Sequence, residues 1–178
     1  KGDYSKSLEY YGKALSIRQQ SLPENHPHLA TSYNNIGSVY RNKGDYPKSL
    51  EYYGKALSIR QQSLPENHPD LATSYNNIGL VYSSMGDYPK SIEYYGKALS
   101  IQQQSLPENH PHLATSYNNI GLVYDSMGDY PKAHFYCERA VQIVKCSLPS
   151  NHPDLLMYKR NLECVKDALW RSSLTHIK

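Results

Sequence analysis

The sequence lacks any run of 18 or more apolar residues, so no segment of it is long enough to cross a membrane as a helix. It has only three cysteines, all in the last quarter, and none of them forms a Cys-x-x-Cys spacing. This sparse usage favours a reduced, cytoplasmic setting. Acidic and basic residues nearly balance, at a net charge of +3, and the basic residues are spread along the chain, which argues against a nucleic-acid surface.

Catalytic motifs are absent as well. The sequence contains no Gly-x-Ser-x-Gly, no His-Glu-x-x-His and no paired-carboxylate arrangement. Gly54-Lys55 resembles the end of a phosphate-binding loop, but Ser49 stands where that loop needs its first glycine, and Ala56 replaces its Ser or Thr. We therefore predict a protein that is not an enzyme and that carries no cofactor.

One histidine recurs in each Asn-His-Pro segment, at His26, His68, His110 and His152. Zinc needs its ligand nitrogens ~2 Å from one centre, whereas packed helices place successive units on the order of 10 Å apart. We expect these histidines to cap loops, and we predict no metal site.

An internal repeat of 42 residues dominates the chain. Gly-Asp-Tyr begins at Gly2, Gly44, Gly86 and Gly128, and Ser-Leu-Pro recurs with the same spacing. Between residues 27–68 and residues 69–110, only seven of 42 positions differ. These are His28/Asp70, Ser38/Leu80, Arg41/Ser83, Asn42/Ser84, Lys43/Met85, Leu50/Ile92 and Arg60/Gln102. The chain also opens in the middle of a unit, at Lys1, which indicates a piece of a longer array.

The residue pattern within each unit predicts two helices. The first runs from Pro27 to about Asn42 with apolar or small residues at helical spacing; Gly44 ends it, Asp45 can cap the next helix, and Pro47 fits that helix's first turn. The second helix has two apolar flanks, which implies two neighbours and hence a stacked solenoid. We divide the chain into a truncated first unit (1–26), three complete units (27–68, 69–110, 111–152) and a capping helix (153–178).

The repeated residues resemble the tetratricopeptide repeat signature. They are Asn35-Ile36-Gly37-x-x-Tyr40, Gly44-Asp45-Tyr46, Ser49, Tyr53 and Ala56. The 42-residue period and the segment ALSIRQQSLPENHP are similar to the long repeats of kinesin light chains. The resemblance implies an all-α, right-handed solenoid of antiparallel helix pairs with about eight helices. It also implies a non-catalytic scaffold that binds an extended peptide or partner segment in a concave groove lined by the first helix of each unit.

Paired asparagines interrupt each first helix, although asparagine favours turns and caps over helix interiors. On a helical wheel they lie opposite the packed residues, and a side-chain amide can both donate to and accept from a peptide backbone. The resemblance therefore implies a ligand-facing ladder, and the variable neighbouring positions would set its selectivity. The predicted peptide-binding residues are Asn34, Asn35, Ser38, Arg41, Asn76, Asn77, Leu80, Ser83, Asn118, Asn119, Leu122 and Asp125. The alternative is that the asparagines bridge adjacent helices, and the two roles are compatible.

Three further expectations concern the first helix, Cys137 and the competing function. The first helix would leave Tyr4, Leu8, Tyr11 and Leu15 in water, which predicts self-association through that helix. Cys137 replaces a repeated core tyrosine and is expected to be a buried thiol. The competing function is a structural spacer, a self-assembly surface or the sensor arm of a larger multidomain protein.

Overall fold

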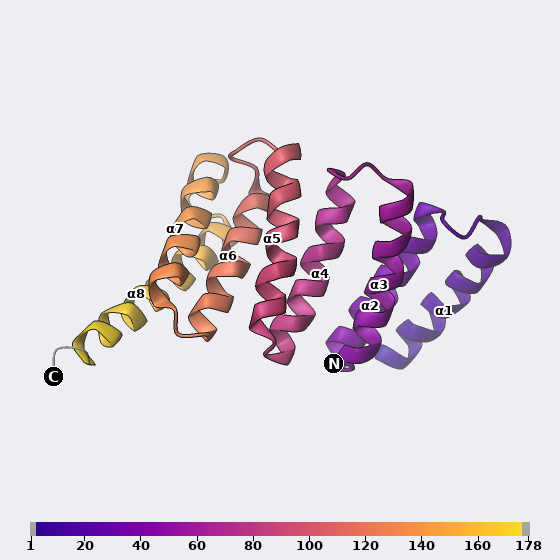
Figure 1. Cartoon of the computed structure of the whole chain (residues 1–178), viewed down its shortest axis with the longest axis horizontal. Coiled ribbons are helices and arrows are strands. Elements are labelled where there is room, and N and C mark those ends of the chain that lie inside the picture. Colours follow the sequence, from indigo (N-terminus) through magenta and orange to yellow (C-terminus); the bar gives the residue numbers. More distant parts are fainter. Residues whose placement is uncertain (1–2, 176–178) are drawn as a thin grey trace.

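The structure, a computed structural model, describes residues 3–175, and this part of the chain folds into eight helices and no strand. The helices are α1 (Tyr4–Ser21), α2 (Pro27–Lys43), α3 (Tyr46–Ser63), α4 (Pro69–Met85), α5 (Tyr88–Ser105), α6 (Pro111–Ser126), α7 (Tyr130–Ser147) and α8 (Pro153–Thr175). They stand side by side in one elongated row from α1 to α8 (Figure 1). The predicted all-α solenoid of about eight helices is confirmed.

Local sequence explains where the helices start and stop. Gly44 has a left-handed backbone conformation, with φ of 83°, after the end of α2. The side chain of Asp45 then accepts a hydrogen bond from the backbone nitrogen of Lys48, and Pro47 lies in the first turn of α3. The same three devices recur in the next unit, so the chain reverses in the same way.

We call α2, α4, α6 and α8 the A helices, and α1, α3, α5 and α7 the B helices. Each of α2, α4 and α6 packs on the B helix that follows it and, less extensively, on the B helix that precedes it. α3 takes part in both contacts: Ile59 joins a core with Leu29 of α2, and Tyr53, whose ring also contacts α2, joins a core with Ile78 of α4. The prediction of two neighbours for a B helix is confirmed for α3, α5 and α7.

Glycine allows the closest contact within each unit. A Cβ atom on Gly37 would lie 2.8 Å from the Tyr53 ring, so only glycine fits between α2 and α3 at this point. The hydroxyl of Ser49 donates to the Gly37 carbonyl oxygen at 2.8 Å and fixes the same junction. This explains why serine can stand where related repeats usually have alanine. The predicted packing role of the glycine is confirmed.

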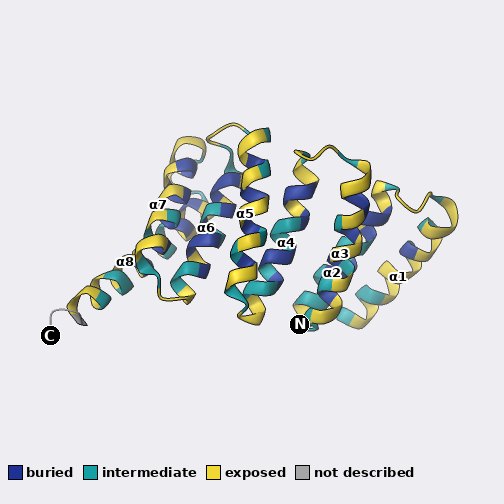
Figure 2. Cartoon of the chain, in the orientation of Figure 1, coloured by how far each residue is buried: buried dark blue, intermediate teal, exposed yellow. Residues whose placement is uncertain are grey.

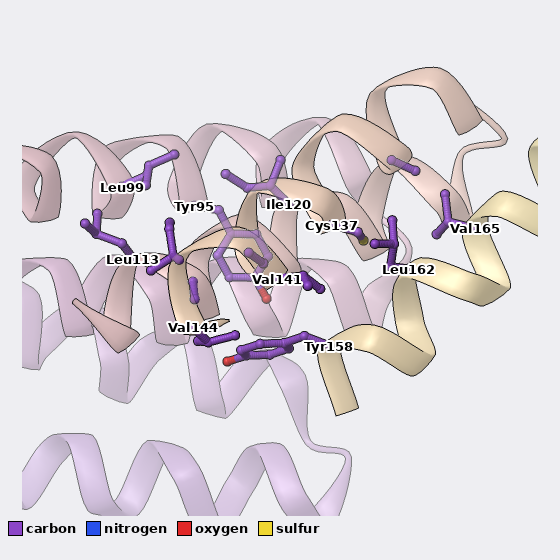
Figure 3. Packing of buried hydrophobic residues seen from close by; sticks show 14 of the residues in the cluster. Tyr95, Leu99, Leu113, Ile120, Cys137, Val141, Val144, Tyr158, Leu162 and Val165 are labelled. Atoms are coloured by element: carbon purple, nitrogen blue, oxygen red, sulfur yellow. The ribbon is translucent and has the colours of Figure 1, made fainter. Parts of the chain in front are cut away.

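The last unit holds a continuous core between α7 and α8. Cys137, Leu162 and Val165 lie together there, beside the side chains of α6 (Figure 3). Buried residues follow the inner faces of the row, and α8 is exposed along its outer part (Figure 2). Trp170, on that outer part, is exposed. An A helix with one buried and one solvated side fits the expected capping role.

The exposed surface of α1 differs from the prediction. Leu15 is buried and Leu8 is partly buried, because both pack against α2. The prediction that these two residues face water is therefore wrong. The apolar side chains that α1 does expose are Tyr10, Tyr11 and Ile17.

Candidate functional site

Asparagine side chains connect successive A helices. Asn77 Nδ2 of α4 donates to Asn34 Oδ1 of α2 at 2.8 Å, and Asn119 Nδ2 of α6 donates to Asn76 Oδ1 of α4 at 3.2 Å. The series ends on α8, where Asn161 Nδ2 donates to Asn118 Oδ1 at 2.9 Å. The bridging role of the asparagines is confirmed by these bonds, and together they hold the A helices in one continuous surface.

Each bridge engages the amide oxygen of one asparagine and the amide nitrogen of the other, and it leaves the remaining polar atom of each side chain unbonded. The bridges at Asn34 and Asn76 occupy their oxygen atoms, and the bridges from Asn77 and Asn119 occupy their nitrogen atoms. Among the described residues, no other hydrogen bond engages these four side chains, and all four are partly exposed. Each of these junctions therefore keeps one amide nitrogen and one amide oxygen for another molecule. Asn118 is different, because only 4% of its surface is exposed.

The variable positions lie on the same helices. Ser38, Leu80 and Leu122 occupy one equivalent position of α2, α4 and α6, and Arg41, Ser83 and Asp125 occupy another. All are partly exposed or exposed, and Leu80 also packs against the core. We call the surface formed by the twelve predicted residues the A-helix face. It is cationic at Arg41, apolar at the two leucines and anionic at Asp125.

The positive charge of Arg41 on this face influences the buried tyrosines Tyr53 and Tyr95. Burial raises the pKa of the Tyr53 and Tyr95 hydroxyls, and the positive charge of Arg41 acts in the opposite direction on both. Arg41 thus lies close enough to influence two successive units. Its Nη2 donates to Asn42 Oδ1 at 3.1 Å, which holds the guanidinium along the surface.

Cys137 lies below the anionic end of the A-helix face and is fully buried. Burial and, to a smaller extent, the nearby Asp125 carboxylate raise the pKa of its thiol to about 11. Because the thiolate is the reactive form, this cysteine is not an activated nucleophile. The prediction of a buried thiol is confirmed.

The other sequence candidates have structural partners. Lys55 Nζ lies 2.6 Å from Glu51 Oε1 on the surface of α3, in the middle of the helix, so the Gly54-Lys55 pair forms no phosphate-binding loop. His26 Nδ1 accepts a hydrogen bond from the backbone nitrogen of His28 at the start of α2, as the histidines of the other units do at their own helices. Among residues 3–175, no three potential metal ligands cluster.

Sequence reasoning missed the residues that tie each B helix to the next A helix. Arg18 Nη1 donates to the His28 carbonyl oxygen at 3.1 Å and to Ser32 Oγ at 2.6 Å. Arg60 makes the same two bonds to α4, and burial lowers the pKa of its guanidinium. Gln102 occupies this position in α5. The Arg60/Gln102 difference was visible in the repeat comparison, but nothing in the sequence showed that this position reaches an A helix.

Comparison with known proteins agrees with this architecture. The helix-pair solenoid with a partly exposed A-helix face is typical of a non-catalytic protein-interaction scaffold. A family model described as "Tetratricopeptide repeat" matches residues 1–62, 28–104 and 70–145. The chain therefore belongs to the tetratricopeptide repeat family.

Solved structures show the same fold. BtubC (BKLC) of P. vanneervenii is 29% identical with a TM-score of 0.84, over 94% of this chain and 67% of that one. A Podosopora anserina protein with nearly identical TPR-like repeats, related by its description to kinesin light chains, is 21% identical with a TM-score of 0.80, over 98% and 83%. The apo form of RapI is 22% identical with a TM-score of 0.80, over 98% and 61%. No curated protein gave a match. No helix among the described residues is long and apolar enough to span a bilayer.

Proposed function

We propose that the A-helix face binds an extended segment of a partner protein and that the chain performs no catalysis. The observation that carries this proposal is the unused half of the asparagine bridges. An extended peptide needs alternating donors and acceptors for its backbone, and each of the first two junctions offers one of each. Because every peptide has the same backbone, this contact is independent of the partner's sequence.

The variable positions would then select the partner. Arg41 favours an acidic side chain, Leu80 and Leu122 favour apolar ones, and Asp125 favours a basic one. Arg41 and Asp125 lie two units apart, on the order of 20 Å for helices packed ~10 Å apart. An extended chain rises ~3.3 Å per residue, so about six residues of the partner would separate its acidic and basic side chains.

A random peptide library displayed on phage tests the proposal. We expect selection on the chain to enrich peptides with an acidic and a basic residue about six positions apart, and Arg41→Glu to reverse the acidic preference. Lys43→Glu, an exposed change in the same last turn of α2, is the matched control and should leave the preference unchanged. If no peptide is retained, the face is not a peptide site, and the spacer or sensor-arm interpretation replaces this one.

The asparagines are tested with a selected peptide. Replacing Asn77 and Asn119 together by alanine should weaken binding by about 1 to 3 kcal/mol, because peptide groups would lose their partners. Isothermal titration calorimetry measures this loss, and circular dichroism confirms that the variant remains helical. Unchanged affinity would limit the asparagines to their bridging role.

We also propose that the chain acts in the cytoplasm and associates with itself. Its three cysteines are all free thiols, which supports a reducing compartment.

Tyr10 and Ile17 of α1 are 69% and 67% exposed, and a second copy of α1 would cover them in a two-fold contact. Light scattering after gel filtration should show a dimer that Tyr10→Glu with Ile17→Glu dissociates and Ser16→Glu does not. A monomer at high concentration would disprove self-association.

A further inference from the structure

The exchange of Arg60 for Gln102 changes how the B helix meets the next A helix. In the earlier unit, Ser74 Oγ accepts from Arg60 and donates to the Asp70 carbonyl oxygen, 3.2 Å away. In the later unit, Ser116 Oγ instead donates to Gln102 Oε1 at 2.7 Å. The shorter, neutral glutamine thus removes a buried cation from this position and redirects the serine hydroxyl.

Gln102 is left with an unused donor although its side chain is only 8% exposed. Its oxygen is engaged by Ser116, and no described residue accepts from its amide nitrogen. Among the described residues, every fully buried side-chain nitrogen or oxygen has a hydrogen-bond partner. Because the Gln102 nitrogen has no such partner, it is accessible to solvent rather than fully buried. A polar group that is mostly buried and still lacks a partner in the protein is placed to receive one from a ligand.

The Gln102 side chain lines a pocket of ≈ 170 Å³ on the side of the A helices. The pocket is lined by Thr73, Asn76, Gln102, His112, Thr115 and Ser116. Asn76 is also part of the A-helix face, and its nitrogen stays free because only its oxygen joins the bridge to Asn119. The hydroxyl of Thr115, a lining residue, also lies 3.0 Å from the Tyr158 hydroxyl of α8.

The lining determines which side chain fits. It contains no Asp, Glu, Lys or Arg, and its one titratable residue is His112. A charged side chain entering it would lose water without gaining a counter-ion, which is costly. A carboxamide is neutral, and it could accept from the nitrogens of Gln102 and Asn76 and donate to the threonine hydroxyls. The volume equals the share of about five to six water molecules, enough for the roughly five heavy atoms of a glutamine side chain.

We propose that this pocket selects a glutamine or asparagine side chain of the segment bound on the A-helix face. The inference rests on the proposed function, because the side chain must be presented by a bound segment. It assigns to Gln102 a specificity role that the equivalent Arg18 and Arg60 cannot have, since each of them uses its guanidinium to bond the next A helix.

The phage library separates this inference from the proposed function. The wild-type chain should enrich peptides with Gln or Asn at one fixed position, and Gln102→Arg, which restores the residue of the earlier units, should reduce that enrichment at least tenfold. Arg60→Gln with Asp70→His is the reciprocal variant, because Asp70 occupies the position of His112, and it should create a second Gln or Asn preference, about three residues away for units ~10 Å apart. Gln102→Met keeps a similar volume without the donor and should behave like Gln102→Arg, which guards against a folding defect in either variant.

Each outcome decides a different point. Peptides enriched without a Gln or Asn preference, or a preference that survives both Gln102 variants, would overturn the pocket while leaving the groove intact. Failure to enrich any peptide would overturn the proposed function and this inference with it.

Discussion

The ring of Tyr53 in α3 lies directly over Gly37 in α2, at a distance that leaves no room for a methyl group. The next unit repeats the relationship with Gly79 and Tyr95, where a Cβ atom would lie 2.9 Å from the ring. Each unit thus depends on one glycine for the approach of its two helices, although glycine costs about 1 kcal/mol relative to alanine inside a helix.

Two glycine variants in one unit should shift stability in opposite directions. Gly37→Ala should destabilise by about 1 to 3 kcal/mol, because the added methyl group overlaps the Tyr53 ring. Gly54→Ala, in the middle of α3, meets no atom within 4 Å and should stabilise by about 0.5 to 1 kcal/mol. Urea denaturation followed by circular dichroism measures both. Equal effects of the two changes would refute the packing role of Gly37.

The asparagine bridges should be detectable as pairwise coupling. A double-mutant cycle of Asn34→Ala and Asn77→Ala should give a coupling of about 0.5 to 1.5 kcal/mol for their 2.8 Å hydrogen bond. Asn35 serves as the control, because its side chain makes no hydrogen bond to any described residue, and Asn35→Ala with Asn77→Ala should be additive. Additivity in both cycles would show that the bridge contributes no stability.

The three thiols should differ in reactivity. Cys146 and Cys164 are exposed, whereas Cys137 is buried and its pKa is raised to about 11. At pH 8 a disulfide reagent such as Ellman's should modify two thiols per folded chain and the third only after unfolding in guanidinium chloride. Cys146→Ser with Cys164→Ser should then leave a folded chain with no fast reaction. A rapid third thiol in native protein would contradict the burial of Cys137.

The last helix should contribute stability mainly through its inner side. Leu162→Ala should cost about 2 to 5 kcal/mol, since the side chain is buried against α7, whereas Leu156→Ala, half exposed, should change stability by less than about 0.5 kcal/mol. Removal of residues 155–178 should uncover the α7 core and cause aggregation, observable by light scattering. A soluble, equally stable truncation would disprove the capping role.

The sequence predicted the fold well because every unit repeats its own start and stop signals. Gly44, Asp45 and Pro47 each constrain the backbone locally, so their effect does not depend on distant residues. The apolar flanks of α3 correctly indicated two neighbours. The α1 surface was predicted less well, since the helix wheel of α1 cannot show that α2 covers Leu8 and Leu15 rather than another helix.

The candidate site was predictable only in part. A helical wheel shows that Asn34 and Asn35 leave the packed side, but their partners belong to the next unit, and the distance between units follows from packing. The same limit applies to Gln102. The sequence predicts that this residue lies on a B helix but does not predict its partner. Its contact with Ser116 depends on how α5 and α6 cross, and no local pattern encodes that angle.

Because the units are nearly identical, the array can become longer or shorter by whole units of 42 residues. Loss of residues 69–110 would bring Asn119 against Asn34, Ser116 against Arg60 and Ile120 against Tyr53, each a residue of the type already present at that junction. A gene that gains or loses one such segment would therefore produce a chain with no new interface to optimise. The length of partner that such a chain could hold would change by about three residues for each unit, at ~10 Å per unit and ~3.3 Å per extended residue.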